Sequence, residues 1–274
     1  DAAALQFEKA LAIDPASTTA RTGLATIAMQ EEDYAGALEI LNAGLEQNPD
    51  DLQTLLNIAG VHEKRGEMGA MAQSLEQAIA QHPESLAPRL MMGRYQLLRG
   101  KPGVTVDLLT EVRDDFKDDP RIHQLLTAAF LALNQPGPAV TSGERLVQLL
   151  PDTPAALRLA ARAHAANGDL KVAERYLRRV LERYPDDIET RKLLVENIIG
   201  QQDWQSASDE LEKIPQDVVP DWQMNIARGR IELRAGNYAQ AEKLLRKAYQ
   251  EKPASNALLF LSGALWQQGK GANA

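Results

Sequence analysis

The sequence predicts an all-α protein built from a row of helix hairpins, and three observations support this prediction. The chain of 274 residues is rich in alanine and leucine, and aromatic residues make up only 5% of it. This composition favours closely packed helices over β-sheets, which use more β-branched and aromatic side chains. Prolines recur at intervals of 34 residues, and a stripe of small and large apolar residues recurs at the same interval.

The prolines form a grid that divides the whole chain into repeats. Six of its eight nodes hold proline, and the other two hold Lys117 and Val219; the prolines are Pro15, Pro49, Pro83, Pro151, Pro185 and Pro253. Because proline cannot continue a helix, each node marks the end of a helical segment. The grid predicts a half repeat at 1–17 and another at 256–274. Between them lie seven full repeats, at 18–51, 52–85, 86–119, 120–153, 154–187, 188–221 and 222–255.

The second half of each repeat carries a small, a large and a mostly small residue on one helical face. In the seventh repeat these residues are Ala241, Leu245 and Ala248, which lie twelve, eight and five positions before the node. Spacings of four and three residues place them on the same side of a helix. Gly143 replaces the large residue in the fourth repeat. The stripe therefore predicts that each repeat is a pair of helices packed along this face.

A glycine followed by a polar residue separates the two predicted helices in several repeats. The three pairs are Gly66-Glu67, Gly168-Asp169 and Gly236-Asn237. Such a glycine is expected to end the first helix in the left-handed conformation, and the polar residue is expected to cap the second helix.

Two departures from the pattern predict local irregularities. Gly143 and the missing proline at Lys117 predict a loosened joint around residues 100–145. Pro215 lies within the expected last turn of the sixth repeat, where it lacks a donor and crowds the preceding turn. That helix is therefore expected to end near Ile214.

The composition excludes several kinds of functional site. Cysteine is absent, so disulfides, thiolate metal sites and a cysteine nucleophile are excluded. The net charge of −8 disfavours a nucleic-acid-binding surface. No apolar run approaches the ~18 residues that a membrane span needs. We therefore expect neither nucleic acid as a partner nor direct membrane insertion.

The remaining polar and aromatic residues are interpreted as structural. The four histidines fall at three different repeat positions, which favours packing over a metal site; they are His62, His82, His123 and His164. Acidic pairs recur just after the nodes, where helix capping explains them; they are Asp50-Asp51, Asp118-Asp119 and Asp186-Asp187. Trp204, Trp222 and Trp266 are interpreted as packing residues. We therefore predict no catalytic residues, no metal and no cofactor, and no enzyme activity.

The repeat as a whole resembles the tetratricopeptide repeat. Its clearest copy in this chain combines Gly229, Gly236-Asn237-Tyr238, Ala241, Leu245, Ala248 and Pro253. The resemblance covers the whole chain and implies a single right-handed superhelical α-solenoid of antiparallel helix hairpins. It also implies that the first helix of each repeat lines a concave groove, and that the chain is a protein–protein interaction scaffold.

The first helices carry a stripe of side chains that the resemblance directs into this groove. The stripe occupies positions two, five, nine and twelve of each repeat, which lie on one helical face. Its candidate ligand-binding residues are Leu90, Arg94, Arg121, Gln124, Leu131, Arg158, Arg162, Lys192, Ile226 and Arg230. One interpretation is that the cations are solvated, some of them paired with Glu189 and Glu196. The other is a groove that attracts an acidic peptide, a carboxylate or a polyanionic sugar, because the planar guanidinium binds carboxylates through two hydrogen bonds.

Several functional alternatives stay open beside the peptide-binding scaffold. The array could be the docking part of an enzyme whose catalytic domain is absent, since the half repeats suggest a fragment of a longer protein. Leu258, Leu259, Leu261 and Leu265 are expected to lack a partner helix, which also suggests end-to-end self-association. In style the sequence is similar to bacterial repeat proteins of exopolysaccharide secretion and the PEP-CTERM system. That likeness implies a periplasmic or envelope-associated location, with the cytoplasm as the alternative.

Overall fold

The computed structural model describes residues 2–215, 222–253 and 256–270. Every regular element in these ranges is an α-helix, and none is a strand. The helices belong to two compact units, Asp1–Ala129 and Phe130–Ala274. The prediction of an all-α fold of antiparallel helix hairpins is confirmed, whereas the extent of a single solenoid over 1–274 stays a prediction.

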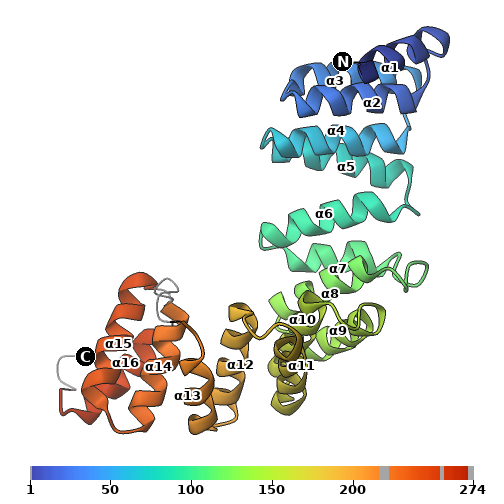
Figure 1. The fold of residues 1–274 in the computed structure, drawn as a ribbon. Helices are drawn as coiled ribbons and strands as arrows, with labels where there is room; N and C mark the ends of the chain where they lie inside the picture. The colour runs from blue at the N-terminus through green and yellow to red at the C-terminus, as the bar shows by residue number, and fades with distance from the viewer. Residues whose placement is uncertain (1, 216–221, 254–255, 271–274) are drawn as a thin grey trace. The chain divides into compact units, whose positions relative to one another are not determined.

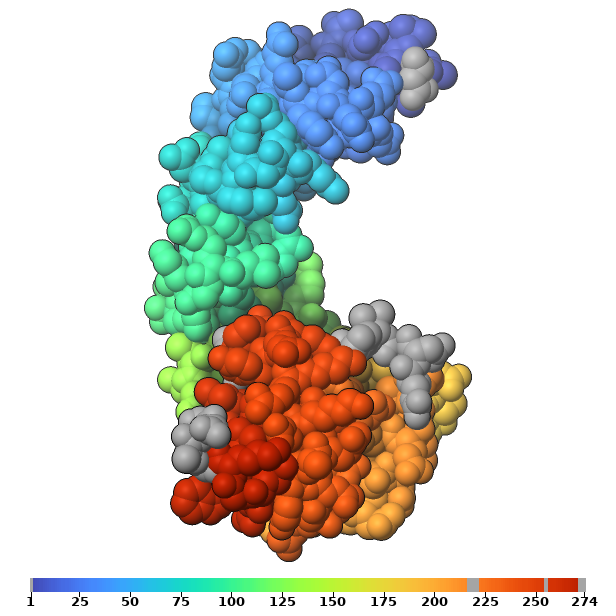
Figure 2. Space-filling model, turned by 90° about the vertical axis from the view of Figure 1, so that its left-hand side faces the viewer, coloured from blue at the N-terminus to red at the C-terminus, as the bar shows by residue number. Residues whose placement is uncertain are grey.

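Unit 1 contains three hairpins and the helices that flank them. The hairpins are α2 (Thr18–Gln30) with α3 (Tyr34–Gln47), α4 (Leu52–Lys64) with α5 (Met68–Gln81), and α6 (Leu86–Leu98) with α7 (Pro102–Thr110). α1 (Ala2–Ile13) packs on α2, and α8 (Pro120–Ala132) begins in this unit. Each hairpin packs on the next, so the hairpins form successive layers (Figure 1). The space-filling view shows that the side chains of neighbouring hairpins touch (Figure 2).

Unit 2 repeats the same arrangement. Its helices are α9 (Pro136–Leu149), α10 (Pro154–Ala166), α11 (Leu170–Arg183), α12 (Ile188–Gly200), α13 (Trp204–Glu212), α14 (Trp222–Arg234), α15 (Tyr238–Glu251) and α16 (Ala257–Gln267). The hairpins are α10 with α11, α12 with α13, and α14 with α15. In both units, the first helices of full repeats begin at intervals of 34 residues, from Thr18 to Trp222. The spacing read from the prolines is therefore the spacing of the helices.

The predicted apolar stripe forms the centre of each hairpin. Ala37, Leu41 and Gly44 are buried on α3, and Ala241, Leu245 and Ala248 are buried on α15. The facing first helix must come close to the large residue of this stripe. A Cβ atom at Gly229 would lie only 2.6 Å from Leu245 Cγ, so this position on α14 requires glycine. Shape complementarity at this seam thus explains why small residues oppose the large one.

The turn between the two helices places one residue in the left-handed region in every full repeat. Gly66, Gly168 and Gly236 have φ values of 73°, 88° and 83°, which confirms the prediction for these glycines. Glu32 and Gln202 occupy the equivalent position with φ values of 60° and 62°. A side chain makes this conformation less favourable by about 1–2 kcal/mol. The hairpin geometry therefore fixes the turn even where the sequence lacks glycine.

The capping prediction is right for first helices and wrong for the three polar residues that follow a turn glycine, whereas Asp33 and Asp203 do cap second helices. Asp51 and Asp187 cap first helices by accepting hydrogen bonds from the backbone N–H groups of Thr54 (2.7 Å) and Thr190 (2.9 Å). Glu67, Asp169 and Asn237 stand at the N-caps of second helices but make no side-chain capping bond. Their side chains turn back toward the preceding helix instead. The Glu67 carboxylate, for example, lies 2.7 Å from His62 Nδ1.

Two second helices are shorter than the others, α7 and α13, with nine residues each. α13 ends at Glu212, close to the end that Pro215 predicts. α7 has no such proline. There the buried Arg89 guanidinium donates hydrogen bonds to the carbonyl of Leu108 (3.0 Å) and to the carboxylate of Glu111 (2.6 Å). Both acceptors lie at the C-terminal end of α7.

A matching arginine sits beside α13. Arg191 occupies the same repeat position as Arg89, and it donates to Glu210 (2.6 Å) and to the carbonyl of Pro185 (2.5 Å). In the second and fifth repeats this position holds the buried Leu55 and Leu157, and the second helices there have fourteen residues. An arginine at repeat position four thus accompanies both shortened second helices, buried at Arg89 and half-buried at Arg191, although the half-buried Arg21 holds the same position beside the fourteen-residue α3.

Replacing Glu32 or Gln202 by glycine is expected to stabilise the protein by about 0.5–1 kcal/mol, because glycine adopts a positive φ without strain and only part of the gain is lost to chain entropy. Urea unfolding of each variant measures this change. As the matched control, Gly168→Ala is expected to lower the stability by a similar amount. A destabilised Glu32→Gly variant would contradict the assigned turn conformation.

Replacing Arg89 by methionine is expected to lower the free energy of unfolding by about 2–3 kcal/mol. Methionine keeps the apolar length of the side chain, but the carbonyls of Pro83 and Leu108 lose their buried donor. Glu111 is 62% exposed, so Glu111→Gln is expected to change the stability by less than about 1 kcal/mol. Thermal melts of the two variants compare these effects, and equal losses would show that the ion pair rather than the carbonyl contacts matters.

Candidate functional site

A cavity of about 390 Å³ opens between α6 and α8 in unit 1. Seven residues line it: Ala87, Leu90, Met91, Arg94, Arg121, Gln124 and Leu125. On each helix these residues follow spacings of three and four, so they share one face. Four of the candidate groove residues predicted from the sequence therefore meet in one place, namely Leu90, Arg94, Arg121 and Gln124.

The cavity has an apolar floor and a polar rim. Leu90 is buried and Met91 and Leu125 are half-buried, whereas Arg94, Arg121 and Gln124 are exposed. An apolar recess with a few convergent polar groups is typical of a binding site. No acidic residue lines the cavity.

Arg94 forms one ion pair, with Glu63 of α4. Its Nη2 atom lies 2.6 Å from Glu63 Oε1, and the two side chains are 57% and 40% exposed. Exposed pairs of this kind contribute only about 0–1 kcal/mol, because water competes for both partners. The guanidinium keeps further N–H groups that can bind another acceptor.

Arg121 is held more firmly by Asp119, just before α8. Its Nε and Nη2 atoms lie 3.0 Å and 2.6 Å from the two carboxylate oxygens, and its backbone N–H donates to the same carboxylate at 2.9 Å. The side-chain hydrogen bond from Arg121 outweighs the effect of burial and lowers the pKa of Asp119 below its usual value. Asp119 thus orients the arginine and caps the start of α8 at the same time.

In unit 2, two of the predicted groove arginines form ties between helices. Arg158 of α10 lies 2.5 Å from Asp187 Oδ2, and the same carboxylate group caps α12. Arg230 of α14 lies 3.2 Å from Glu196 Oε2 of α12, and its guanidinium stacks 4.9 Å from the ring centre of Phe260 of α16. Burial raises the pKa of Glu196, although the charge of Arg230 acts in the opposite direction.

The remaining predicted groove residues of unit 2 differ in their accessibility. Arg162 is exposed and has no polar partner within the described ranges. Leu131 and Lys192 are half-buried. Ile226 is only 3% exposed, because it packs in a core cluster that Trp222 and Phe260 cover. The prediction that Ile226 lines a groove stays a prediction.

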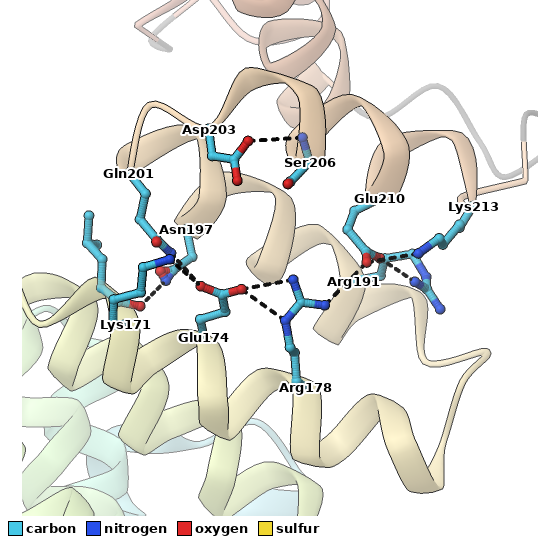
Figure 3. Close-up of polar contacts among 11 residues, drawn as sticks. Lys171, Glu174, Arg178, Arg191, Asn197, Gln201, Asp203, Ser206, Glu210 and Lys213 are labelled. Atoms are coloured by element: carbon cyan, nitrogen blue, oxygen red, sulfur yellow. Dashed lines mark hydrogen bonds and ion pairs between the residues drawn. The ribbon is translucent and has the colours of Figure 1, made fainter.

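A polar network in unit 2 joins α11, α12 and α13 (Figure 3). Glu174 accepts hydrogen bonds from Arg178 (2.9 Å) and Gln201 (2.9 Å). Burial disfavours the charge on Glu210, but Lys213 and Arg191 outweigh this effect and lower its pKa. The charged groups of this network pair with one another and hold the helices together, whereas the buried amide oxygens of Asn197 and Gln201 have no hydrogen-bond partner among the described residues.

The histidines and tryptophans give a mixed outcome for the packing interpretation. His123 and His164 are buried, and Trp204 and Trp222 pack against core clusters. Trp266 is 73% exposed on α16, so its assignment as a packing residue is wrong. Across the described residues, no group of three or more His, Asp or Glu side chains could hold a metal ion. No described helix is long and apolar enough to span a bilayer.

The expectation that four leucines of α16 lack a partner is half right. Leu258 and Leu259 are exposed, but Leu261 and Leu265 are buried against α15. The two buried residues lie on the face that α16 turns toward the preceding hairpin.

Comparison with known proteins decides the family. Three sequence profiles, each described as a tetratricopeptide repeat, match residues 1–59, 154–197 and 226–274. Together these matches cover more than half of the chain. The chain belongs to the tetratricopeptide repeat family. No curated protein sequence matches it.

Solved tetratricopeptide repeat structures share the fold at low sequence identity. A protein from Parabacteroides merdae ATCC 43184 is 14% identical with a TM-score of 0.66, over 88% of this chain and 96% of that chain. YrrB, described as a TPR protein with an unusual peptide-binding site, is 15% identical with a TM-score of 0.58, over 69% and 97%. A thermophilic TPR protein from Thermus thermophilus, TTC0263, is 17% identical with a TM-score of 0.53, over 65% and 97%. At these identities the similarity shows the fold alone.

The sequence alone missed two residues that line this cavity and one ion pair at its rim. Met91 and Leu125 lie at repeat position six, which neighbours positions two, five and nine on the helix. Glu63 lies on the predicted stripe, but its pairing with Arg94 was not expected. Helical geometry could have identified the two apolar residues. The ion pair joins side chains 31 positions apart, so it can be identified only once the packing of α4 against α6 is known.

Glu242 provides a pH test of the last tetratricopeptide repeat. Hydrogen bonds from Lys270, Arg246 and Gln268 lower the pKa of this carboxyl to about 2. A folded-state pKa below the unfolded value of 4.5 stabilises the fold above about pH 4.5, and this contribution is lost as the pH falls toward 2. NMR titration of the glutamate side chains should show this midpoint. Lys270→Ala should raise it and the control Lys252→Ala should not; a midpoint near 4.5 in the unmodified protein would contradict the contacts.

Proposed function

We propose that this chain is a non-catalytic scaffold that binds a peptide segment of a partner protein, with the cavity between α6 and α8 as the anchoring site. The observation that carries the proposal is the convergence of an apolar floor and a polar rim on the side chains of two first helices. Membership of the tetratricopeptide repeat family supports it, because arrays of helical repeats use such surfaces to bind partners. The proposal needs no cofactor.

The cavity lies at the small end of the volumes typical of ligand sites, and it is large enough for a side chain of a peptide. About 390 Å³ accommodates one large apolar side chain together with part of the adjoining backbone. Gln124 on the rim offers both a donor and an acceptor for that backbone. A peptide anchored here by one apolar residue gains roughly 1.5–3 kcal/mol from its burial.

The alternative that this chain is the docking array of an enzyme with a separate catalytic domain would use the same cavity. That alternative therefore differs in what the whole protein does and not in where the peptide binds. An acidic ligand in unit 2 is a weaker proposal, because Arg158 and Arg230 already have carboxylate partners. Arg162 is the exposed cation that would carry it. The likeness to exopolysaccharide-system proteins stays a prediction.

Filling the cavity tests the proposal. A peptide is first selected from a random display library on the unmodified protein, and its affinity is measured by fluorescence polarisation. Ala87 is exposed on the rim, so Ala87→Phe fills the opening without entering the core. We expect about a ten- to hundredfold loss of affinity, which corresponds to the lost burial of one apolar side chain.

The matched control is Ala80→Phe, which adds the same ring to an exposed position on α5. It should leave the affinity unchanged. If both variants bind the selected peptide as tightly as the unmodified protein does, the cavity is not the anchoring site.

A further inference from the structure

We infer that the α6–α8 cavity selects a peptide in which an apolar residue and an acidic residue lie two positions apart, and that Glu63 competes with the acidic residue for Arg94. This inference rests on the proposed function and specifies the chemistry of its ligand. It follows from the charges around the cavity, from the difference between the two ion pairs on its rim, and from the spacing of floor and rim.

The charge of the cavity favours an acidic ligand. Two guanidinium groups reach its rim from facing helices, Arg94 on α6 and Arg121 on α8, and no carboxylate is among its lining residues. The carboxylates that neutralise them approach from outside, Glu63 from α4 and Asp119 from the segment before α8. A ligand carboxylate that enters the cavity therefore meets positive charge first.

The two ion pairs differ in how easily they can be exchanged. Arg121 is fixed by several contacts to Asp119, which is only 18% exposed and also receives a backbone hydrogen bond. Arg94 and Glu63 share one contact between exposed side chains, and Arg94 has no other polar partner among the described residues. A carboxylate that binds the guanidinium through two hydrogen bonds can therefore replace Glu63.

The spacing of floor and rim sets the spacing of the ligand residues. Leu90 and Arg94 are one helical turn apart, which is about 6 Å along α6. In an extended peptide, side chains two positions apart point the same way and are separated by about 6.8 Å. When an apolar side chain of the peptide packs on Leu90, the carboxylate of the peptide residue two positions away thus lies beside Arg94.

The apolar floor favours a peptide over a polyanionic sugar. Leu90, Met91 and Leu125 offer no hydrogen-bonding groups from their side chains, and no aromatic ring lines the cavity. A charged sugar would place hydroxyl groups on this apolar surface without partners, at a cost in desolvation. A peptide buries an apolar side chain there instead.

Two synthetic peptides, each acetylated and amidated at its ends, test the inference. One has the sequence Gly-Leu-Ser-Glu-Ser-Gly, and its twin carries Gln in place of Glu. Their dissociation constants are measured by NMR titration of the full chain. We expect the acidic peptide to bind at least fivefold more tightly than its twin, and Arg94→Met to abolish this preference.

Removing the internal competitor provides the decisive variant. Glu63→Gln keeps the shape of the side chain but removes its charge, so the acidic peptide is expected to bind about three- to tenfold more tightly while the affinity of its twin stays unchanged. The control Glu76→Gln removes the same charge from an exposed position on α5 and should change neither affinity. Arg175→Met serves as the matched control for Arg94→Met, because it removes an exposed arginine from α11, a second helix outside the predicted groove stripe.

The outcomes separate this inference from the proposed function. Equal affinities for the two peptides, or no effect of Glu63→Gln, would overturn the inference. The proposed function would still be supported in that case if Ala87→Phe blocks peptide binding. Tighter binding of an oligouronate than of the acidic peptide would also overturn it in favour of a sugar ligand. If no peptide binds at the cavity, including those selected by display, the proposed function itself fails.

Discussion

The close contact between the two helices of each hairpin is the interaction on which the other features of this protein depend. A large side chain on the second helix, such as Leu41 or Leu245, is fully buried against small residues of the first. At Gly229 the approach leaves no room even for a methyl group. This contact sets the spacing at which the first helices of successive hairpins follow one another. The cavity between α6 and α8 lies between two such first helices.

The same packing imposes conformations that the local residues do not favour. Glu32 and Gln202 adopt a positive φ because the hairpin has to turn there, although glycine fills the position in other repeats. At repeat position four, the buried Arg89 and the half-buried Arg191 satisfy carbonyls and carboxylates at the ends of α7 and α13. Irregular repeats therefore keep the overall spacing by replacing an apolar contact with hydrogen bonds, which are effective only when buried groups are fully paired.

Electrostatics explains why the cationic stripe is less available than its sequence suggests. Arg94, Arg121, Arg158 and Arg230 each have a carboxylate partner, although the stripe reads as a row of cations. The partners come from neighbouring helices or from helix caps, and they reduce the attraction for an external anion. What distinguishes the α6–α8 cavity is that one of its pairs is exposed and singly bonded, so an anion can compete there.

The sequence by itself determined the class of helix hairpins, the interval of 34 residues and the buried stripe, because each depends on periodicities along one helix or on proline and glycine at fixed positions. It also placed Leu90, Arg94, Arg121 and Gln124 on the faces that meet in the cavity. Only the tertiary structure decided that Ile226 is covered by Trp222 and Phe260, that Trp266 is exposed, and that Glu63 neutralises Arg94. Those outcomes depend on which side chains of separate helices come within a few ångströms of one another, and such distances are set by the packing of whole helices.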